Sequence, residues 1–229
     1  MNDDSPSPRR VALSYPLSTT TPYPAGGLPV QVKPQMHLSA GDVANTSVVS
    51  YWNHSGTHID GPAHMMPQAG PLTEYVPAAG LWLSRPLLVD VACGEDDLLT
   101  AADLRKAAPT AAECDVLLLR TGFAKRRASD PDSYTSRNPG LSPSAAHWVL
   151  ENYPGVRCIG VDTISVAAMA HLKEGIEAHR VLFQHQPPVL LIEDLNLEND
   201  FSQLQRVVVV PFFVEGLDSC ACTVIAELK

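Results

Sequence analysis

Short apolar runs, separated by polar loops and by segments with helical periodicity, extend along most of this 229-residue chain. Continuous runs of apolar residues predict buried strands at 87–91, 116–122, 156–161, 189–194, 207–214 and 220–226. Shorter β-like pieces occupy 11–17 and 29–38, on either side of a loop rich in proline and glycine at 21–29. The pattern therefore predicts a chain that combines strands and helices.

Three segments are predicted to be helical. Thr100 precedes the first, at 101–105, as an N-cap residue, and Ser142 with Pro143 supplies a cap and a first-turn proline for the second, which runs to about 150. His147 and Trp148 are interpreted as part of that second helix and its packing. The third segment, 174–183, has helical periodicity and carries His179.

The densest cluster of reactive side chains lies between residues 54 and 64. His54, His58, Asp60 and His64 all occupy even positions, and glycine stands at 56. In an extended chain, side chains alternate between the two faces, so this parity would place all four on one side. A shared face is what a metal site needs.

Helical and extended geometry compete for this cluster. Residues 48–52 contain β-branched and aromatic side chains, and Gly61-Pro62 and Pro67 stop helices, so we predict a strand that continues into an irregular loop. A straight strand would separate the Cα atoms of His54 and His58 by roughly 13 Å, too far for two imidazoles that bind one ion at about 2.1 Å. We therefore expect a bend at Gly56.

A lone buried histidine is usually a hydrogen-bonded core residue, and one His-x-x-x-His pair has little specificity. Four potential ligands or proton carriers within eleven residues, flanked by glycine and proline, are harder to explain as core packing. Imidazole and carboxylate ligands without thiolate suit Zn²⁺ or Mn²⁺, and donor softness does not choose between the two ions. The cluster is therefore predicted to be a metal or catalytic site.

Composition and charge restrict the partners. A hydrophobic content of 45%, a charged content of 18% and 229 residues fit one globular domain, with 1–9 as a flexible segment and 10–229 as the domain. The net charge of −9 disfavours nucleic acid and anionic membranes as partners and is compatible with a small neutral substrate.

No apolar run approaches the roughly 20 residues of a membrane span, and no apolar core of a signal peptide is found, so a cytoplasmic location is expected. Five cysteines without a Cys-x-x-Cys pair suggest neither disulfides nor a structural zinc knuckle.

The central string resembles the His-x-Gly-Thr-His-x-Asp-x-Pro-x-His signature of the cyclase family, which contains bacterial kynurenine formamidase and isatin hydrolase. Every fixed position of that signature is met, by His54, Gly56, Thr57, His58, Asp60, Pro62 and His64. The resemblance extends from about residue 10 to 226. It implies a single α/β domain with a mixed sheet or barrel-like core wrapped by helices, of the swivelling β/β/α type, assembled as a homodimer or homotetramer.

The resemblance also implies roles for individual residues. His54, His58 and Asp60 would hold a first ion, and His179 and Glu193, with Asp60 as a bridge, could complete a second site. Their separation of fourteen residues is about two more than the family pattern, which makes His185 an alternative ligand; we expect His185 to lie on the surface.

Other polar residues are assigned with less support. The resemblance makes Tyr23 and Pro24 candidates for the substrate pocket, although their loop could equally be a plain surface connection. Ser165, which follows a strand that resembles the family, is a third candidate for substrate binding, but the usual acid after this serine is absent, which leaves open whether its hydroxyl positions water or caps the chain. Arg120, at the end of a predicted strand, is expected to pair with a structural acid rather than a substrate carboxylate.

These assignments predict a metal-dependent amidohydrolase acting on a small amide or lactam, with N-formylkynurenine as the leading substrate. His64 is left free of metal, and its ordinary pKa near 6.5 suits a general base. An aromatic polyketide cyclase would use the same Lewis acid and base for aldol condensation and dehydration. A metal-stabilised binding protein without catalysis is the third hypothesis, against which the presence of His64 argues.

Overall fold

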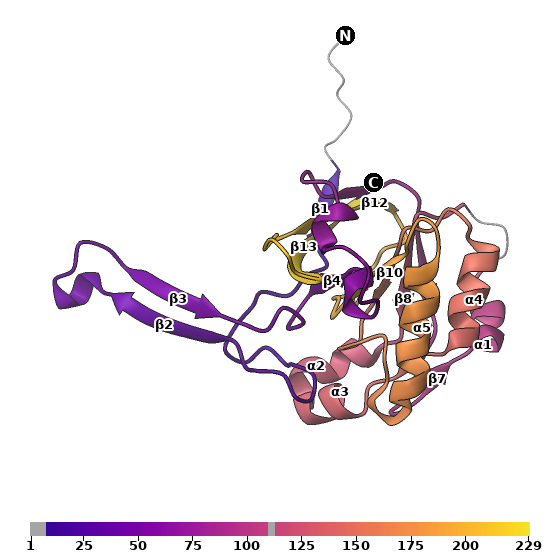
Figure 1. The fold of residues 1–229 in the computed structure, drawn as a ribbon, viewed down its shortest axis with the longest axis horizontal. Coiled ribbons are helices and arrows are strands. Elements are labelled where there is room, and N and C mark those ends of the chain that lie inside the picture. The colour runs from indigo at the N-terminus through magenta and orange to yellow at the C-terminus, as the bar shows by residue number, and fades with distance from the viewer. Residues whose placement is uncertain (1–7, 110–112) are drawn as a thin grey trace, which may run out of the picture.

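The strands of this computed structural model, which describes residues 8–109 and 113–229, form one large curved sheet and two small ones (Figure 1). The strands are β1 (Arg9–Ala12), β2 (Gln31–Met36), β3 (Thr46–Ser50), β4 (His58–Asp60), β5 (Leu81–Leu83), β6 (Pro86–Asp90), β7 (Leu98–Leu99), β8 (Val116–Arg120), β9 (Gly140–Leu141), β10 (Cys158–Val161), β11 (Leu190–Glu193), β12 (Leu204–Pro211) and β13 (Ser219–Leu228). The helices are α1 (Ala101–Ala107), α2 (Arg126–Ser129), α3 (Pro131–Ser136), α4 (Pro143–Asn152) and α5 (Leu172–Gln184).

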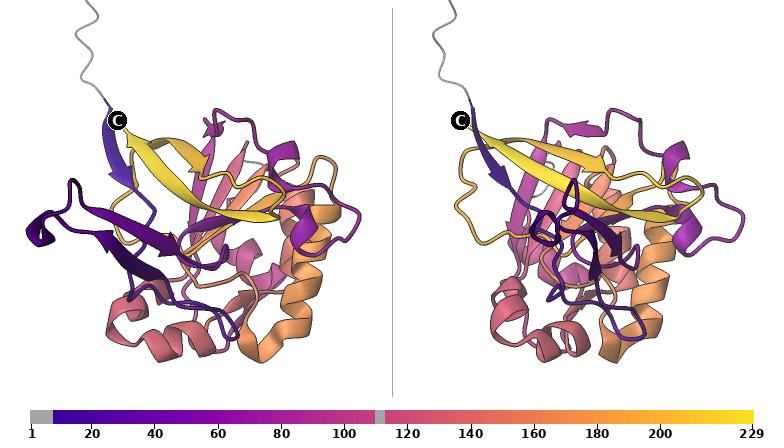
Figure 2. Two further views of the ribbon diagram at one scale, coloured as in Figure 1. Left: turned by 60° about the vertical axis from the view of Figure 1, so that its left-hand side comes forward. Right: turned by 90° about the vertical axis from the view of Figure 1, so that its left-hand side faces the viewer.

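The large sheet is mixed, with the order β5-β12-β13-β4-β11-β10-β8-β6, and β1 pairs with β13 outside this path. Strands β6, β8, β10 and β11 run parallel, whereas β4, β13, β12 and β5 are joined by antiparallel pairing. The sheet curls until β12 also contacts β6, as the two views in Figure 2 show from the side. The expected mixed, barrel-like α/β core is confirmed.

Alternate residues of the parallel strands fill two separate layers of core. In β8, Leu117 and Leu119 pack on the helix side of the sheet, whereas Val116 and Leu118 pack in the interior of the curl. All four side chains are at most 1% exposed, so both faces of this strand are buried. A strand buried on both faces reads as a continuous apolar run, which explains why the pattern Val-Leu-Leu-Leu was recognisable in the sequence.

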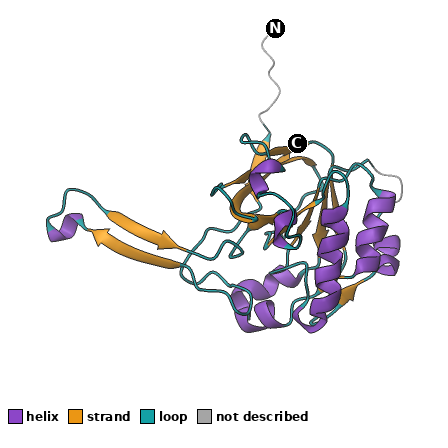
Figure 3. Ribbon diagram, in the orientation of Figure 1, coloured by secondary structure: helices purple, strands orange, loops and turns teal. Residues whose placement is uncertain are grey.

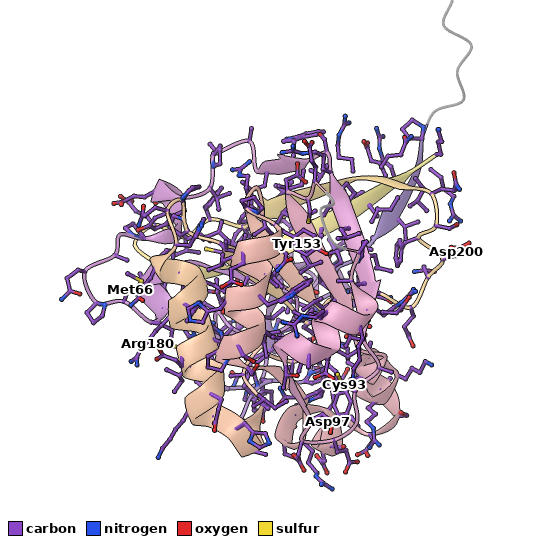
Figure 4. The ribbon with its side chains drawn as sticks, turned by 90° about the vertical axis from the view of Figure 1, so that its right-hand side faces the viewer. Met66, Cys93, Asp97, Tyr153, Arg180 and Asp200 are labelled. Atoms are coloured by element: carbon purple, nitrogen blue, oxygen red, sulfur yellow. The ribbon has the colours of Figure 1, made fainter. Side chains whose placement is uncertain are left out.

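Three helices cover the parallel half of the sheet. Helix α4 packs between α1 and α5, and the three lie side by side when viewed from the helix side (Figure 4). Arg180 projects outward from α5 in that view, whereas Tyr153, after α4, is fully buried. None of the helices within residues 8–109 and 113–229 combines the length and apolarity needed to cross a membrane.

Strands β2 and β3 form a hairpin that projects away from the body (Figure 3). Its register pairs Val32 with Val49 and Lys33 with Val48. The side chains of all three valines are about half exposed. An isolated two-stranded hairpin is marginally stable in water. Exposed apolar side chains on such a hairpin are typical of a surface that packs against another part of a protein.

Most of the predicted elements are present with boundaries shifted by a few residues. The capping signals hold: Thr100 N–H donates to Asp103 before α1, and Ser142 Oγ accepts from Ala145 N–H at the start of α4. The predicted piece at 11–17 is shorter than expected, since β1 ends at Ala12. Of the segment 1–9, residues 1–7 lie outside the described residues and Arg9 pairs with Leu228.

Candidate metal centre

The chain bends sharply through the histidine motif. Gly56 adopts a left-handed conformation with φ of +68°, between the end of β3 and the start of β4. The bend expected at this residue is confirmed. Residues Pro62–His64 then form a 3-10 turn, so only His58 and Asp60 of the four clustered side chains belong to a strand. The cluster is therefore assembled by a bend and a turn, and the even spacing along one extended strand does not explain it.

Strand β4 is fixed between β13 and β11 at the junction of the antiparallel and parallel halves of the sheet. His58 lies opposite Glu193 of β11 and Ala221 of β13, and Asp60 lies opposite Leu191 and Ser219. Ile59 points to the other face, into the core. The register thus brings the acid at the end of β11 directly beside the motif.

Four histidine and carboxylate side chains meet in a continuous series of short contacts. Asp60 Oδ1 lies 3.1 Å from His54 Nδ1 and 3.4 Å from His58 Nε2. Glu193 Oε2 lies 3.3 Å from His58 Nε2. These distances join one acid from the motif to a second acid from a strand far away in the sequence.

His179 enters the same cluster from helix α5. Its Nε2 lies 3.6 Å from Glu193 Oε1, and its side chain is 2% exposed. His185, six residues later, donates from its ring Nδ1 to the carbonyl oxygen of Pro187 beyond the end of the helix. The structure therefore brings His179, and not His185, to Glu193.

Backbone carbonyls determine which ring nitrogens face the carboxylates. His58 Nδ1 donates to Gly56 O at 2.8 Å, and His179 Nδ1 donates to Gly175 O at 2.7 Å. A carbonyl oxygen accepts only, so each Nδ1 carries a proton and each Nε2 is the nitrogen that faces Glu193. Lone pairs that converge on carboxylate oxygens require a cation or a proton between them, and histidine ligands of metals are oriented in this way.

Two buried polar atoms support this interpretation. Among the described residues, His58 Nε2 and Asp60 Oδ1 are fully enclosed and have no hydrogen-bond partner of acceptable geometry. Burial of unpaired polar atoms is costly, and nearly all such atoms in native proteins are satisfied. An ion bound by His54, His58 and Asp60, three of whose donor atoms lie within 4.8 Å of one another, would satisfy both. The residues present therefore fit a divalent cation with nitrogen and oxygen ligands.

Ser165 contacts one of the candidate ligands. Its hydroxyl donates to Glu193 Oε1 at 3.1 Å, and the N–H of Val166 donates to the same oxygen at 2.7 Å. The amide of Asn138 donates to the carbonyls of Ser165 and Ala167, which anchors this loop. The Ser165 hydroxyl therefore orients a carboxylate, and its assignment to substrate binding stays a prediction.

His64 lies at the open edge of the cluster. Its ring centroid is 4.2 Å from that of His54 and 5.9 Å from that of His179, and its side chain is 26% exposed. One donor atom of His64 lies within 4.8 Å of donor atoms of Asp60 and His179. Its nitrogen Nδ1 lies 3.0 Å from Asp218 Oδ2.

Asp218 was missed in the sequence. It precedes β13 in the loop after Glu215-Gly216, and its Oδ2 contacts His54 Nε2 at 3.1 Å as well as His64. An acid just before an apolar run was the available signal, whereas Glu193 ends such a run and was predicted through the family resemblance. The strand order that brings β13 next to β4 was not available from the sequence.

Tyr23, Pro24 and Arg120 lie apart from these contacts. Tyr23 is 37% exposed, and the Pro24 carbonyl accepts from Gly27 N–H; no hydrogen bond among the described residues joins either to the cluster. Their assignment to the substrate pocket stays a prediction. Arg120 forms a bidentate pair with Asp90, as expected for a structural role.

The ionisation of the cluster follows from its contacts. Burial lowers the pKa of His54, but contacts with the carboxylates of Asp218 and Asp60 outweigh burial and raise that pKa to about 10. Burial raises the pKa of Glu193, but its contacts with His179 and His58 outweigh burial and lower it to about 2. Without a cation the cluster thus retains protons on its imidazoles, which metal binding would displace.

Comparison with known proteins gives concordant matches. A family model described as "Putative cyclase" matches residues 11–168. Cyclase-like protein 3 of Oryza sativa subsp. japonica is 26% identical over 178 residues, which cover 78% of this chain and 64% of the rice protein. The chain therefore spans less than two thirds of that relative.

Two further proteins match over most of their lengths. Kynurenine formamidase of Geobacillus thermodenitrificans is 26% identical over 195 residues, which cover 82% of this chain and 83% of that enzyme. The solved structure of isatin hydrolase A from Labrenzia aggregata, bound to benzyl benzoate, superposes with a TM-score of 0.74 at 21% identity, covering 96% of this chain and 93% of that one. At this identity the superposition establishes the fold.

Proposed function

Because this chain belongs to the cyclase family, we propose that it is a metal-dependent hydrolase of a small amide or lactam, with N-formylkynurenine as the leading substrate. The observation that carries the proposal is the convergence of His58 Nε2 and Asp60 Oδ1, both buried and unpartnered among the described residues, on a group of further imidazole and carboxylate donors. The relatives named kynurenine formamidase and isatin hydrolase support this choice of substrate class.

His54, His58 and Asp60 would hold one Zn²⁺ or Mn²⁺ ion, and His179 and Glu193 would hold a second with Asp60 between them. A bound divalent cation supplies Lewis acidity, which lowers the pKa of a water molecule and polarises an amide carbonyl. Ser165 and the N–H of Val166 keep Glu193 in place, because both donate to its Oε1. The backbone carbonyls of Gly56 and Gly175 fix the tautomers of His58 and His179.

His64 is the proton carrier in this proposal. Asp218 accepts from its Nδ1, so Nε2 is free to take a proton from the attacking water and to return it to the leaving nitrogen. The partial exposure of His64 allows its ring to contact a substrate. His58 and Asp60 are only 1% exposed, which suits side chains that bind a metal ion. Trp52, whose ring centroid lies 5.5 Å from that of His54, offers an aromatic surface beside the site for an aryl substrate.

The direct test combines metal analysis with an amidase screen. Protein purified without added metal and protein loaded separately with Zn²⁺ and Mn²⁺ are assayed with N-formylkynurenine, isatin and related lactams. We expect bound metal and turnover of at least one aryl amide, lost on chelation and restored by the ion. If the protein bound no metal and a chelator changed nothing, the enzyme function would be wrong.

We also propose that the chain forms a homodimer or homotetramer through the β2-β3 hairpin. Val32, Val48 and Val49 are exposed on the hairpin, and Phe212 is exposed on the body beside a hollow of about 780 Å³ that Val49 and Tyr51 also line. Two apolar surfaces on one chain can cover each other reciprocally around a twofold axis. A second copy is therefore the partner that this surface fits.

Sedimentation of wild type and of the Val48→Asp and Val49→Asp variants tests the assembly. We expect a dimer or larger species for wild type and monomers for the variants, with Arg180→Asp on helix α5 as the control that stays assembled. A monomeric wild type would overturn this part of the proposal.

We also propose a cytoplasmic location. All five cysteines are unpaired, as is usual for proteins of a reducing compartment.

A further inference from the structure

Asp218 is fixed beside the histidine motif by its backbone. Its carbonyl accepts from Gly61 N–H at 2.9 Å, and the next residue, Ser219, pairs with Asp60 at the start of β13. The carbonyl of Leu217 accepts from Leu72 N–H, which ties the same loop on its other side. The carboxylate therefore has a defined position relative to the site, although its side chain is 26% exposed.

The two carboxylate oxygens of Asp218 have different partners. Oδ2 contacts His54 Nε2 at 3.1 Å and His64 Nδ1 at 3.0 Å, and Oδ1 accepts from Asn53 Nδ2 at 2.9 Å. The hydroxyl of Ser219 in turn donates to the carbonyl of Asn53 at 3.3 Å. One oxygen is thus shared by two imidazoles, while the other is held by an amide that prevents rotation of the carboxylate.

An ionised carboxylate accepts hydrogen bonds and cannot donate them, so each ring nitrogen that faces Asp218 must carry its proton. Once a cation displaces the second proton of His54, the lone pair of this ring is on Nδ1, the nitrogen 3.1 Å from Asp60 Oδ1. His64 keeps a lone pair on Nε2. A neutral imidazole has one protonated nitrogen, and the hydrogen bond it makes decides which one.

We propose that Asp218 is a positioning residue that sets the tautomers of both His54 and His64 through a single oxygen, so that one imidazole is prepared to bind a cation and the other to accept a proton. For His64 the inference rests on the proposed hydrolase function. Carboxylates that orient a catalytic or metal-binding histidine typically contribute 10-fold or more to activity or metal affinity.

The rings of His54 and His64 also lie close together, which makes a negative charge beside both of them necessary. Their centroids lie 4.2 Å apart with an interplanar angle of 38°, so two protonated imidazoles would repel each other. The carboxylate lies against both rings and offsets that repulsion while a proton is on His64. Replacing the carboxylate by a neutral amide would remove the offset and turn one of its two acceptor oxygens into an NH2 group, which cannot accept from the imidazoles or from Asn53 Nδ2.

The test compares Asp218→Asn with wild type and with Asp200→Asn, a control in an exposed loop that Figure 4 shows on the opposite side of the view from Met66, which follows the motif closely. We expect zinc-loaded Asp218→Asn to keep the wild-type zinc stoichiometry while kcat falls about 100-fold or more and KM stays within about threefold. Nitrogen NMR of the histidine rings should show Nδ1 of His64 protonated in wild type and a mixture of tautomers in the variant.

Each other outcome is decisive as well. Loss of one zinc per chain that excess zinc does not restore would identify Asp218 as a ligand with His54 and His64, a group that could itself hold an ion, and would overturn the positioning role. Unchanged kcat and unchanged tautomers would overturn it too. If wild type cleaved no amide, the proposed function would fail, whereas the NMR measurement would still test Asp218.

A second variant keeps the proposal testable if Asp218→Asn does not fold. Asn53→Ala removes the hydrogen bond to Oδ1 and leaves the carboxylate charge in place. We expect it to retain zinc and to lose about tenfold in kcat, with partial mixing of the His64 tautomers. Wild-type kcat together with a wild-type tautomer in Asn53→Ala would overturn the proposal that a held carboxylate positions these rings.

Discussion

The guanidinium of Arg127 donates two hydrogen bonds to the carboxylate of Asp194, at 2.7 and 2.8 Å, directly beside the candidate ligand Glu193. Tyr134 donates to the same carboxylate at 2.6 Å, and the Arg127 guanidinium lies 3.9 Å from the ring centroid of Tyr15. Asp194 is completely buried. Arg127 is therefore the cation that pairs with this buried carboxylate.

Replacing Arg127 by methionine should destabilise the protein by about 3–5 kcal/mol, because it leaves a buried carboxylate without its cation. Urea denaturation measures the free energy of unfolding, and Arg180→Met on the exposed side of α5 is the matched control, expected to change it by less than about 0.5 kcal/mol. A loss below about 1 kcal/mol in Arg127→Met would show that Tyr134 alone satisfies Asp194.

Gly56→Ala should weaken zinc binding by at least about tenfold. At φ of +68° a residue with a Cβ is strained, which disfavours the bend that brings His54 to His58, and the Cβ would lie 2.6 Å from Leu17 Cδ2, so the Leu17 side chain must move as well. Gly41→Ala is the control, since φ is +91° and nothing lies within 4 Å of a Cβ there. Both variants should lose about 1–2 kcal/mol of stability from backbone strain, and only Gly56→Ala should lose zinc affinity in competition with a chelator.

Alanine variants of the histidines should separate metal binding from proton transfer. His58→Ala and His179→Ala remove buried nitrogen donors, so each is expected to lower the bound metal per chain. His64→Ala should keep the metal and lose about 100-fold to 10,000-fold in kcat, because a general base is removed. His185→Ala is the control and should keep both the bound metal and kcat. Metal analysis and steady-state kinetics of the four variants measure these two quantities. A His64→Ala protein with full turnover would exclude the assigned base.

Zinc should stabilise the protein more as the pH rises. In the metal-free protein the pKa of His54 is raised to about 10, so this group's contribution to stability is complete below its unfolded value near 6.5 and is lost as pH rises towards 10. Protons compete with metal for the same nitrogens, so zinc affinity changes in the opposite direction. The difference in Tm between zinc-loaded and chelated protein should therefore widen from pH 6.5 to pH 9 in thermal scans.

A constant difference in Tm across that range would contradict proton competition at the cluster. The Asp200→Asn protein should show the same widening as wild type, because Asp200 lies in a loop outside the cluster. This control separates the effect of the cluster from a general change of net charge with pH.

The sequence predicted the parts of this structure that depend on local pattern. Strand β8 is buried on both faces and appears as an apolar run, and Ser142 with Pro143 begins α4 by its own chemistry. Gly56 was identified as the bend because two histidines four residues apart in a strand cannot meet. His179 and Glu193 were predicted through family resemblance, and the structure brings them within 3.6 Å.

What could not be predicted depends on strand order and register. Asp218 reaches His54 and His64 because β13 pairs with β4, a contact between segments far apart in the chain. Ser165 reaches Glu193 because β10 and β11 are parallel neighbours. The projecting hairpin was also not foreseen, since its residues, 31–36 and 46–50, look like ordinary short strands whether or not they join the main sheet.

Strand β13 lies in the middle of the large sheet, between β12 and β4, and it also pairs with β1. During synthesis on the ribosome, the motif at 54–64 emerges long before residues 219–228. Strand β4 therefore has no β13 to pair with until the end of the chain has been made. Asp218 arrives with that strand. All five proposed metal ligands therefore emerge before the carboxylate that orients His54 and His64, and the hydrogen bonds of Asp218 to both rings form only after the last strand has paired with β4.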